Sequence, residues 1–553
     1  MPRNDYHNWD KPALIAEIKA LNKRKKYGLV WEDKPEDVAA QCREQLPVLK
    51  EIKVLAIRAA DSALPENLLI EGDNYHALSV LNYTHARKID VIYIDPPYNT
   101  GAKDWKYNND FVDKNDGYRH SKWLSMMAKR LGLAKKLLKK NGVLVCTVDK
   151  HEQANLGILL HEIFPVHEIV CVTIVHNPGG IQGHNFSHTN EYAYFVHPSN
   201  GIHISTVERD DASSFSFRDW GKETSKRESA KTCFYPIYVK DGVITGFGDV
   251  CADDFHPEGA NVKGQSGVLE IYPVDGSGVE RKWRFGRNRV EEIQHELTCK
   301  QVKGELVIIR DKRKYRWKTV WDENIYNANV YGTKLLNKLI GNDFPYPKSL
   351  YAVMDCIRAI IHNRQNAVIL DFFAGSGTTG HAVSLLNRYD GGKRRFILCT
   401  NNENGIAREV CQPRIKAITQ KHEAYPDITG IPLNLRYFKT AFVPALPTDK
   451  NKARLTRKAT EMLCMREGTY EKERDNSDYK IFRNEKRRTG IIYNYAAIGK
   501  FKKAAAKLGG KFSVYVFSFG DEDFSESFAD MRGVVKSRPI PEAILRVYRR
   551  IFK

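Results

Sequence analysis

The chain has 553 residues, of which 42% are hydrophobic and 28% charged, and this composition is typical of a soluble globular protein. The start, MPRNDYHNWDKPALIAEIKA, lacks an apolar signal-peptide core. No stretch of the sequence approaches the ~18 apolar residues of a membrane helix. The ten cysteines form no C-x-x-C pair. We therefore expect a reduced, cytoplasmic protein with no membrane partner. The formal net charge of +20 favours a polyanionic partner, most commonly nucleic acid, although small anions and ribosomes also attract basic proteins.

The nearest approach to a metal-binding pattern is formed by Cys171, His176, His184 and His188. Zinc sites usually have more closely spaced pairs of ligands. We therefore predict loop histidines here and no metal site.

Strands and helices are expected to alternate along the first part of the chain. Residues 12–26 have helical spacing, and we predict an N-terminal helical arm over residues 1–63. From residue 64, NLLIEGD predicts a strand, YHALSVLNYTHA a helix and KIDVIYIDPPY a second strand. SKWLSMMAKRLGLAKKLLKK predicts a helix that ends at Asn141 and Gly142 and leads into the strand VLVCTVD. This alternation predicts an α/β layer architecture.

The alternation is interrupted and then resumes. Residues 201–330 are polar, irregular and rich in glycine, whereas residues 331–440 again contain a strand (AVILDFF), a helix (TTGHAVSLLNRY) and a strand (RRFILCT). Residues 441–553 begin with the charged stretch TDKNKARLTRKATEM and form a further C-terminal section. One sheet, built from residues 64–200 and 331–440 and interrupted by an inserted domain, is the simplest interpretation.

The sequence IDPPY follows a run that is apolar on both faces, as expected for a strand buried in a mostly parallel sheet. Asp95 then lies at the carboxyl end of a strand, where open α/β sheets place their active sites. Pro96 and Pro97 fix the backbone, so the Asp95 carboxylate and the Pro96 carbonyl are held as two acceptors beside the ring of Tyr98. This arrangement suits an exocyclic amino group on a flat ring; the alternative is a proline turn with a surface aspartate.

The sequence DFFAGSGTTG, at residues 371–380, follows another buried strand. Gly375 and Gly377 allow the backbone to approach a ligand, and the N-terminus of the following helix attracts negative charge. The pattern G-x-G-x-x-G fits either a dinucleotide pyrophosphate or the carboxylate of an amino-acid-like cofactor. Asp371 and two phenylalanines directly before the glycines, together with the DPPY acceptors, favour the second ligand.

DPPY followed downstream by FxGxG resembles the circularly permuted, beta-group amino-methyltransferases, which use S-adenosylmethionine. LLIEGDNYHALSVL, DVIYIDPPYNTG, VLVCTVDKHEQANLGILLHEIFP, FPYPKSL, DFFAGSGTTGHAV and IPEAILRVYRRIF together resemble Mod subunits of Type III restriction–modification systems. The resemblance covers most of residues 64–440 and the end of the chain. It implies a Rossmann-like α/β methyltransferase fold with a mostly parallel sheet, an inserted target-recognition domain at residues 201–330 and a C-terminal domain.

The resemblance also implies site residues. It assigns catalysis and binding of the target base to Asp95, Pro96, Pro97 and Tyr98. It assigns cofactor binding to a larger set, namely Asp73, Lys348, Asp371, Phe373, Gly375, Gly377, Thr378 and Glu403. In that set Asp73 is placed near the cofactor adenine, Lys348 near its carboxylate and Glu403 near its ribose; a helix N-cap and a surface charge are the alternatives for Asp73 and Lys348. TVDKHE departs from the S-[IV]-D-D-N-E of many relatives, so Lys150 and His151 receive no role.

The insert interleaves cations with aromatic residues, and such runs can grip phosphates and stack on bases. The candidate DNA-binding residues are Arg281, Lys282, Trp283, Arg284, Arg287, Arg313 and Arg316. Alternating faces of exposed strands would produce the same pattern, but the family places its target-recognition domain here.

The resemblance implies an enzyme that transfers a methyl group from S-adenosyl-L-methionine to the N6 amine of a flipped adenine in double-stranded DNA. It further implies a homodimer, a helicase–nuclease (Res-type) restriction partner and association with the bacterial nucleoid through DNA. The alternatives are an N4-cytosine methyltransferase, an adenine methyltransferase without a nuclease partner, a dinucleotide oxidoreductase and a non-catalytic DNA-binding regulator. No Pro-Cys dipeptide occurs, which argues against a carbon-5 cytosine enzyme.

Overall fold

The computed structural model describes residues 9–23, 31–61, 63–302, 304–361, 364–522 and 524–552. The chain folds into two compact units. The middle unit contains residues 206–317, and the first unit contains the residues before and after it. The predicted insert of residues 201–330 therefore corresponds to a unit that is shorter at both ends. No helix among the described residues is long and apolar enough to cross a membrane.

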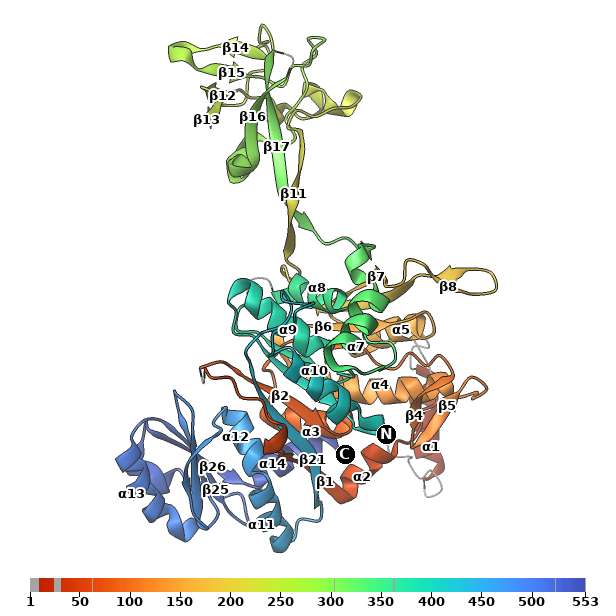
Figure 1. The fold of residues 1–553 in the computed structure, drawn as a ribbon, viewed down its shortest axis with the longest axis vertical. Helices are drawn as coiled ribbons and strands as arrows, with labels where there is room; N and C mark the ends of the chain where they lie inside the picture. Colours follow the sequence, from red (N-terminus) through yellow and green to blue (C-terminus); the bar gives the residue numbers. More distant parts are fainter. Residues whose placement is uncertain are drawn as a thin grey trace. The chain divides into compact units, whose positions relative to one another are not determined.

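A ten-stranded sheet runs through the first unit (Figure 1). Its strands, in spatial order, are β1 (Gln45–Glu51), β21 (Asn434–Pro444), β2 (Glu66–Glu71), β20 (Arg395–Thr400), β19 (Val368–Asp371), β3 (Ile89–Ile94), β6 (Leu138–Val148), β10 (Asn190–Pro198), β7 (His167–Val175) and β18 (Val320–Trp321). From β21 to β6 every neighbouring pair is parallel, whereas β1 and β10 pair antiparallel with their neighbours. The mostly parallel sheet predicted from the sequence is confirmed.

Two groups of helices pack on this sheet. One group is α3 (Asn74–Thr84), α4 (Arg119–Lys135) and α5 (Gln153–Ile163); the other is α7 (Leu335–Ile340), α8 (Leu350–Ile361), α9 (Thr378–Asp390) and α10 (Gln412–Ala417). Helices contact their neighbours within each group. The central strands are buried on both faces, with Ile92, Leu144 and Leu370 fully inaccessible to solvent. These strands therefore read as continuous apolar runs in the sequence.

Two local predictions were wrong. The N-terminal arm is not wholly helical: after α1 (Lys11–Lys23) and α2 (Asp37–Glu44), the chain forms strand β1, which pairs with β21 at the edge of the sheet. Residues 24–26 of the predicted arm lie outside the described residues. The helix predicted to reach Asn141 ends at Lys135, because Leu138 pairs with Ile89 and draws the following residues into β6. In both places pairing with a distant strand overrides local helix propensity.

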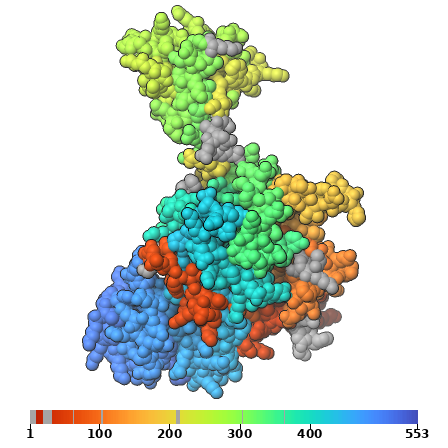
Figure 2. Space-filling view, viewed as in Figure 1, coloured from red at the N-terminus to blue at the C-terminus, as the bar shows by residue number. Residues whose placement is uncertain are grey.

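The C-terminal residues belong to the first unit. After α11 (Asp449–Lys458) and α12 (Thr460–Glu467), a five-stranded sheet contains β22 (Glu471–Asp475), β23 (Tyr479–Arg483), β24 (Arg488–Ile492), β25 (Phe512–Phe517) and β26 (Val535–Ile540), with α13 (Ile498–Leu508) and α14 (Glu542–Ile551). Helices α12 and α14 contact α3, and the Tyr548 hydroxyl donates a hydrogen bond to the Pro47 carbonyl at 2.5 Å. Figure 2 shows these blue residues bordering the red N-terminal residues.

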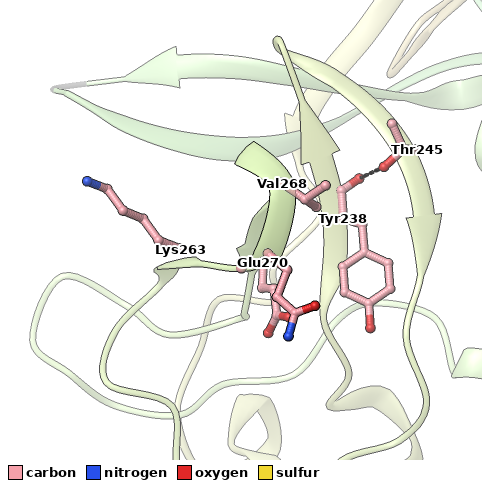
Figure 3. A pocket seen from close by; sticks show the side chains of 7 residues that line it. Tyr238, Thr245, Lys263, Val268 and Glu270 are labelled. Atoms are coloured by element: carbon pink, nitrogen blue, oxygen red, sulfur yellow. Dashed lines mark hydrogen bonds between the residues drawn. The ribbon is translucent and has the colours of Figure 1, made fainter.

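The middle unit is built from two antiparallel sheets. One contains β11 (Thr206–Ser216), β17 (Glu305–Arg316) and β16 (Leu297–Val302), and the other β13 (Val243–Phe247), β12 (Ile237–Lys240), β15 (Leu269–Ile271) and β14 (Asn261–Lys263). Its core contains Phe217, Tyr235 and Trp283. A hollow beside the four-stranded sheet is lined by residues that include Tyr238 and Lys263 (Figure 3).

Candidate active site

The two sequence motifs meet at one edge of the large sheet. Strands β3 and β19 are parallel neighbours, with Val91 opposite Ile369. Asp95 follows the last residue of β3, and Asp371 is the last residue of β19. The base-binding motif and the glycine turn are distant in the sequence, but both lie at the carboxyl edge, where open α/β sheets bind ligands.

Asp95 lies in a cluster with four other polar side chains. The Thr147 hydroxyl donates a hydrogen bond to Asp95 Oδ1 at 2.6 Å, and the Lys348 ammonium lies 3.3 Å from the same oxygen. Lys348 also donates to the Tyr98 hydroxyl and to Glu191 Oε2, and its Nζ lies 4.3 Å from the centre of the Tyr98 ring. The Tyr98 hydroxyl in turn donates to Glu191 Oε2 at 2.8 Å.

Charge within this cluster is shared unequally between two carboxylates. Burial raises the pKa of Asp95, and Lys348 offsets this increase only in part. Burial alone would raise the pKa of Glu191 too, but its direct contact with Lys348 holds the pKa below its ordinary value. Burial opposes the charge of Lys348, and the two carboxylates nevertheless keep its pKa above the usual value. The cluster therefore contains one firmly ionised carboxylate and one whose ionisation is more costly.

Glu191, which is 3% exposed, was not among the residues predicted from the sequence. It is the second residue of β10, a strand that runs antiparallel to β6, so its first residues lie at the edge where β3 and β6 end. The signal in the sequence was a carboxylate at the start of the otherwise apolar and aromatic stretch NEYAYFV.

A second buried cluster holds the segment that follows the DPPY motif. Glu152, which is inaccessible to solvent, accepts hydrogen bonds from the Asn99 amide and from Asn155 Nδ2 at 2.7 Å. Its Oε1 lies 2.6 Å from Nδ1 of His120. The Trp123 indole donates to the Pro97 carbonyl at 2.7 Å. Glu152 is the last residue of TVDKHE, so this stretch contributes its glutamate to the support of the motif, whereas His151 contacts its own neighbour Asp149 at 2.6 Å.

The glycine turn adopts a conformation that requires glycine. Gly375 and Gly377 have φ values of +48° and +80°, in the left-handed region. A Cβ at Gly377 would lie 3.0 Å from Cys411 Sγ, and Gly377 directly precedes helix α9. A Cβ at Gly375 would meet only Phe344 and Phe373, at 3.7 and 3.9 Å. The turn therefore presents backbone to the space before the helix N-terminus.

Asp371 supports the turn from below and is 2% exposed. Its Oδ1 accepts a hydrogen bond from the Phe373 amide at 2.9 Å, and its Oδ2 accepts one from the Thr379 hydroxyl at 2.5 Å. Burial raises the pKa of Asp371 to about 7, although both hydrogen bonds favour the carboxylate. Phe373 is partly buried and packs against Phe372, with ring centres 5.3 Å apart.

Arg414, which the sequence analysis also missed, lies against the same turn. It is inaccessible to solvent and donates to the hydroxyls of Ser376 and Thr378, at 3.1 and 2.7 Å. Its Nε and Nη2 atoms have no hydrogen-bond partner among the described residues. Burial lowers the pKa of Arg414 to about 10. Its sequence context, QPRIKA, is that of an ordinary helix and contains no signal of this position.

The remaining predicted cofactor residues lie at the same edge or near it. Asp73 caps α3 by accepting from the Tyr75 amide at 2.7 Å, and Arg130 lies 3.3 Å from its carboxylate. The adjacent Asn74 donates to the Phe372 carbonyl at 3.0 Å, which joins this loop to the glycine turn.

Glu403 follows β20 and forms an ion pair of 2.5 Å with Lys106 of strand β4 (Ala102–Tyr107). Lys348 contacts the Asp95 cluster described above.

The candidate DNA-binding residues of the middle unit are largely engaged within the unit. Trp283 is 2% exposed and donates to the Tyr235 carbonyl at 2.8 Å, so its ring offers no face to a base in this conformation. Three arginines have carboxylate partners: Arg281 pairs with Asp275 (2.8 Å), Arg284 with Asp219 (3.3 Å) and Arg287 with Glu291 (2.9 Å). Lys282 lies 4.0 Å from Asp219, while Arg313 and Arg316 are exposed on β17.

Among the described residues, no group of three or more histidine, cysteine, aspartate or glutamate side chains is arranged to hold a metal ion. The ten cysteines are all free thiols.

The chain belongs to the DNA methylase family, whose signature matches residues 89–441. It is 30% identical to the Type III restriction-modification enzyme EcoPI Mod subunit of Escherichia phage P1, over 61% of this chain and 58% of that protein. It is 31% identical to the Type II methyltransferase M.KpnI of Klebsiella pneumoniae, over 60% of this chain and 79% of that protein.

A second Mod subunit, that of StyLTI from Salmonella typhimurium, is 28% identical over 69% of this chain and 61% of that protein. The chain thus spans about three-fifths of the length of these two Mod subunits. Among solved structures, the M1.HpyAVI–SAM complex aligns at 14% identity and a TM-score of 0.30, over 64% of this chain and 100% of that chain. That similarity is too weak to define the fold by itself.

Proposed function

We propose that the protein is an S-adenosylmethionine-dependent DNA methyltransferase that modifies the N6 amine of adenine in double-stranded DNA. The observation that carries the proposal is the meeting of Asp95 and the glycine turn on adjacent parallel strands. A methyl acceptor and a methyl donor bound at these two places would lie side by side at one edge of the sheet. A dinucleotide oxidoreductase would give the Asp95 cluster no role.

The glycine turn fits the proposed cofactor. Two left-handed glycines, the N-terminus of helix α9 and the positive charge of buried Arg414 behind the turn together favour a ligand that carries a carboxylate. The backbone of Gly375 and Gly377 would hold it, with Asp73 and Glu403 at the neighbouring strand ends. S-adenosylmethionine, when bound, supplies an electrophilic methyl group.

The side chains at the Asp95 cluster would activate the acceptor amine. The lone pair of the adenine amine is conjugated with the ring, so the nitrogen is a weak nucleophile. Thr147 and Lys348 both engage Asp95 Oδ1, and we assign acceptance of an amine hydrogen to Oδ2. A second hydrogen bond to the Pro96 carbonyl would draw the nitrogen towards tetrahedral geometry, and positioning would supply much of the remaining catalysis.

The target base has to leave the DNA stack to reach these acceptors. The Lys348 ammonium contacts the Tyr98 ring at its hydroxyl end, so a flipped base would stack on a face of the ring. Glu191 and Lys348 would act as positioning residues, because together they fix the Tyr98 hydroxyl.

Aspartate rather than serine before Pro-Pro-Tyr favours adenine over the N4 amine of cytosine. The similarity to Mod subunits supports a modification subunit of a Type III system, which would act as a homodimer with a helicase–nuclease subunit in the cytoplasm, bound to the nucleoid through DNA. The similarity to a Type II methyltransferase supports the alternative of an enzyme without such a partner.

Methyl transfer from tritiated S-adenosylmethionine to duplex DNA, followed by nucleoside analysis by mass spectrometry, tests the proposal. We expect N6-methyladenine as the product. N4-methylcytosine would refute the choice of base, and a protein that binds neither S-adenosylmethionine nor DNA would refute the proposed activity. Dependence on a co-expressed helicase–nuclease for DNA cleavage tests the Type III assignment.

A further inference from the structure

The positive charge of the chain is distributed unevenly. The middle unit, residues 206–317, contains 20 lysines and arginines and 19 aspartates and glutamates, so it is almost neutral. Residues 444–553 contain 25 cations and 14 acidic residues, so they carry more than half of the net charge of +20. This C-terminal region lies beyond residues 89–441, which match the DNA methylase family. The strongest attraction for a polyanion therefore arises outside the middle unit.

Helix α11 concentrates this charge on one face. Its exposed cations are Lys450, Arg454, Arg457 and Lys458. Their positions in the sequence differ by steps of four, three and one, and this spacing places all of them on one side of a helix. On the opposite side Leu455, Thr456 and Ala459 are buried, so packing of that side fixes the orientation of the cations. We call these four residues the α11 basic face.

No cation of the α11 basic face lies within 4.0 Å of a carboxylate oxygen of the described residues, whereas several other exposed cations of the same region form such ion pairs. Lys472 pairs with Asp475 at 2.6 Å and Arg483 pairs with Glu471 at 2.6 Å. On α11 the sole acidic residue is Asp449, in the first turn. An exposed helix with four uncompensated cations repels itself, and a run of phosphates relieves this repulsion.

The position of α11 relates the face to the active site. Strand β21, which precedes α11, is parallel to β2, and the parallel arrangement continues through β20 and β19 to β3. Helix α11 therefore follows β21 at the same edge of the sheet as Asp95, and it contacts β21 and β1. Four strand spacings of ~4.8 Å separate β21 from β3, roughly 19 Å. At ~3.4 Å per base pair, this distance corresponds to about six base pairs of duplex.

We propose that the α11 basic face binds the phosphates of duplex DNA beside the target site, without reading the base sequence. The proposal rests on the proposed function, since that function supplies the duplex. The face would hold the duplex against the catalytic edge, while recognition of the sequence occurs elsewhere. Phosphate contacts of this kind fix register and orientation and contribute salt-dependent affinity.

The test compares two variants that lose the same number of positive charges. The first is K450Q/R454Q/R457Q/K458Q, in the full chain. The matched control is K472Q/R483Q/K500Q/R549Q, which removes four exposed cations from the same region that already lie near carboxylates. Binding of each protein to a fluorescently labelled duplex is measured by anisotropy over a series of salt concentrations.

The slope of log affinity against log salt reports phosphate contacts. Each lost contact should reduce the slope by about 0.9, so we expect a decrease of about 3.6 for the first variant if all four cations contact phosphate. The control should keep the wild-type slope. An unchanged slope in the first variant, or equal decreases in both variants, would overturn the proposal. The proposal would also be overturned if the first variant bound duplex DNA as the wild type does but lost binding to single-stranded RNA or to anionic vesicles.

Two further measurements keep the result interpretable. Thermal melting and titration with S-adenosylmethionine establish that each variant is folded; if the fourfold variant is not, R454Q/R457Q replaces it, with an expected decrease of about 1.8. Methyl transfer by the wild type is assayed in parallel. If the wild type is inactive but the two variants differ in slope as expected, the proposed function is refuted and the DNA-binding role of the α11 basic face is not. If the wild type is active and the two variants have the same slope, only the DNA-binding role of this face is refuted.

Discussion

Replacement of Asp371 by asparagine should remove a specific pH dependence from the stability of the protein. Asp371 lies beneath the glycine turn and is 2% exposed. Its two hydrogen bonds, from the Phe373 amide and the Thr379 hydroxyl, hold the turn. Asparagine keeps an acceptor for the Phe373 amide, and its amide group can donate to the Thr379 oxygen, so the geometry of the turn should survive.

The size of the effect follows from the pKa of Asp371. Burial raises this pKa from 3.8 to about 7. Between these two values the folded protein retains a proton that the unfolded chain has lost, so the free energy of unfolding decreases as pH rises. Each pH unit costs about 1.4 kcal/mol, and the full interval therefore costs about 4 kcal/mol. The penalty is absent below pH 3.8 and complete above pH 7.

The assay is urea denaturation of the wild type and Asp371→Asn at several pH values from 4 to 8. Other titrating groups are common to both proteins, so the difference between their free energies of unfolding isolates Asp371. We expect this difference to move in favour of the variant by about 4 kcal/mol as pH rises, and then to remain constant above pH 7.

Parallel curves for the two proteins would refute the reasoning, because they would show that Asp371 has the same pKa in the folded and unfolded states. Calorimetric titration with S-adenosylmethionine provides the functional comparison. If Asp371 only supports the turn, the variant should keep most of its cofactor affinity; complete loss of binding would show that the carboxylate itself contacts the cofactor.

Four other substitutions test the site. Asp95→Asn should reduce the rate of methyl transfer by about a hundredfold or more and leave the affinity for S-adenosylmethionine unchanged. The reason is that the lost carboxylate oxygen accepts its hydrogen bond mainly in the transition state. A near-normal rate would exclude Asp95 as the acceptor of the amine hydrogen. Lys348→Met should raise the pKa of Asp95 and move the acidic limb of the rate–pH profile to higher pH, because the ammonium favours the Asp95 carboxylate. Glu191→Gln should lower the pKa of Asp95 and move this limb to lower pH, because the Glu191 charge opposes ionisation of Asp95. Shifts in the same direction would contradict these opposite effects on Asp95. Gly377→Ala should lower the free energy of unfolding by about 2 to 4 kcal/mol, because φ is +80° and the new methyl group would lie 3.0 Å from Cys411 Sγ. Chemical denaturation measures the loss of stability. An unchanged midpoint would show that the turn relaxes to accept the methyl group.

The two motifs and their order along the chain could be predicted from the residues alone. The DPPY stretch and the glycine turn each follow a short, largely apolar run, and this local pattern was sufficient to place both at strand ends. The mostly parallel sheet was likewise predictable, because it depends on the alternation of strands and helices along the chain. Local propensity failed at residues 45–51 and 138–142, where strands form by pairing with partners far away in the sequence.

The side chains that accompany the motifs depend on how distant segments pack. Glu191 reaches Lys348 because β10 runs antiparallel to β6, and Arg414 reaches the glycine turn from a helix that follows it. Likewise, Trp283 was a candidate for stacking on bases until the structure placed it in the core of the middle unit. Local spacing encodes the face of a helix or strand on which a residue lies, whereas the partner of that face depends on how distant segments pack. For this reason the sequence indicated the chemistry of the site, and the fold determined which charges tune it.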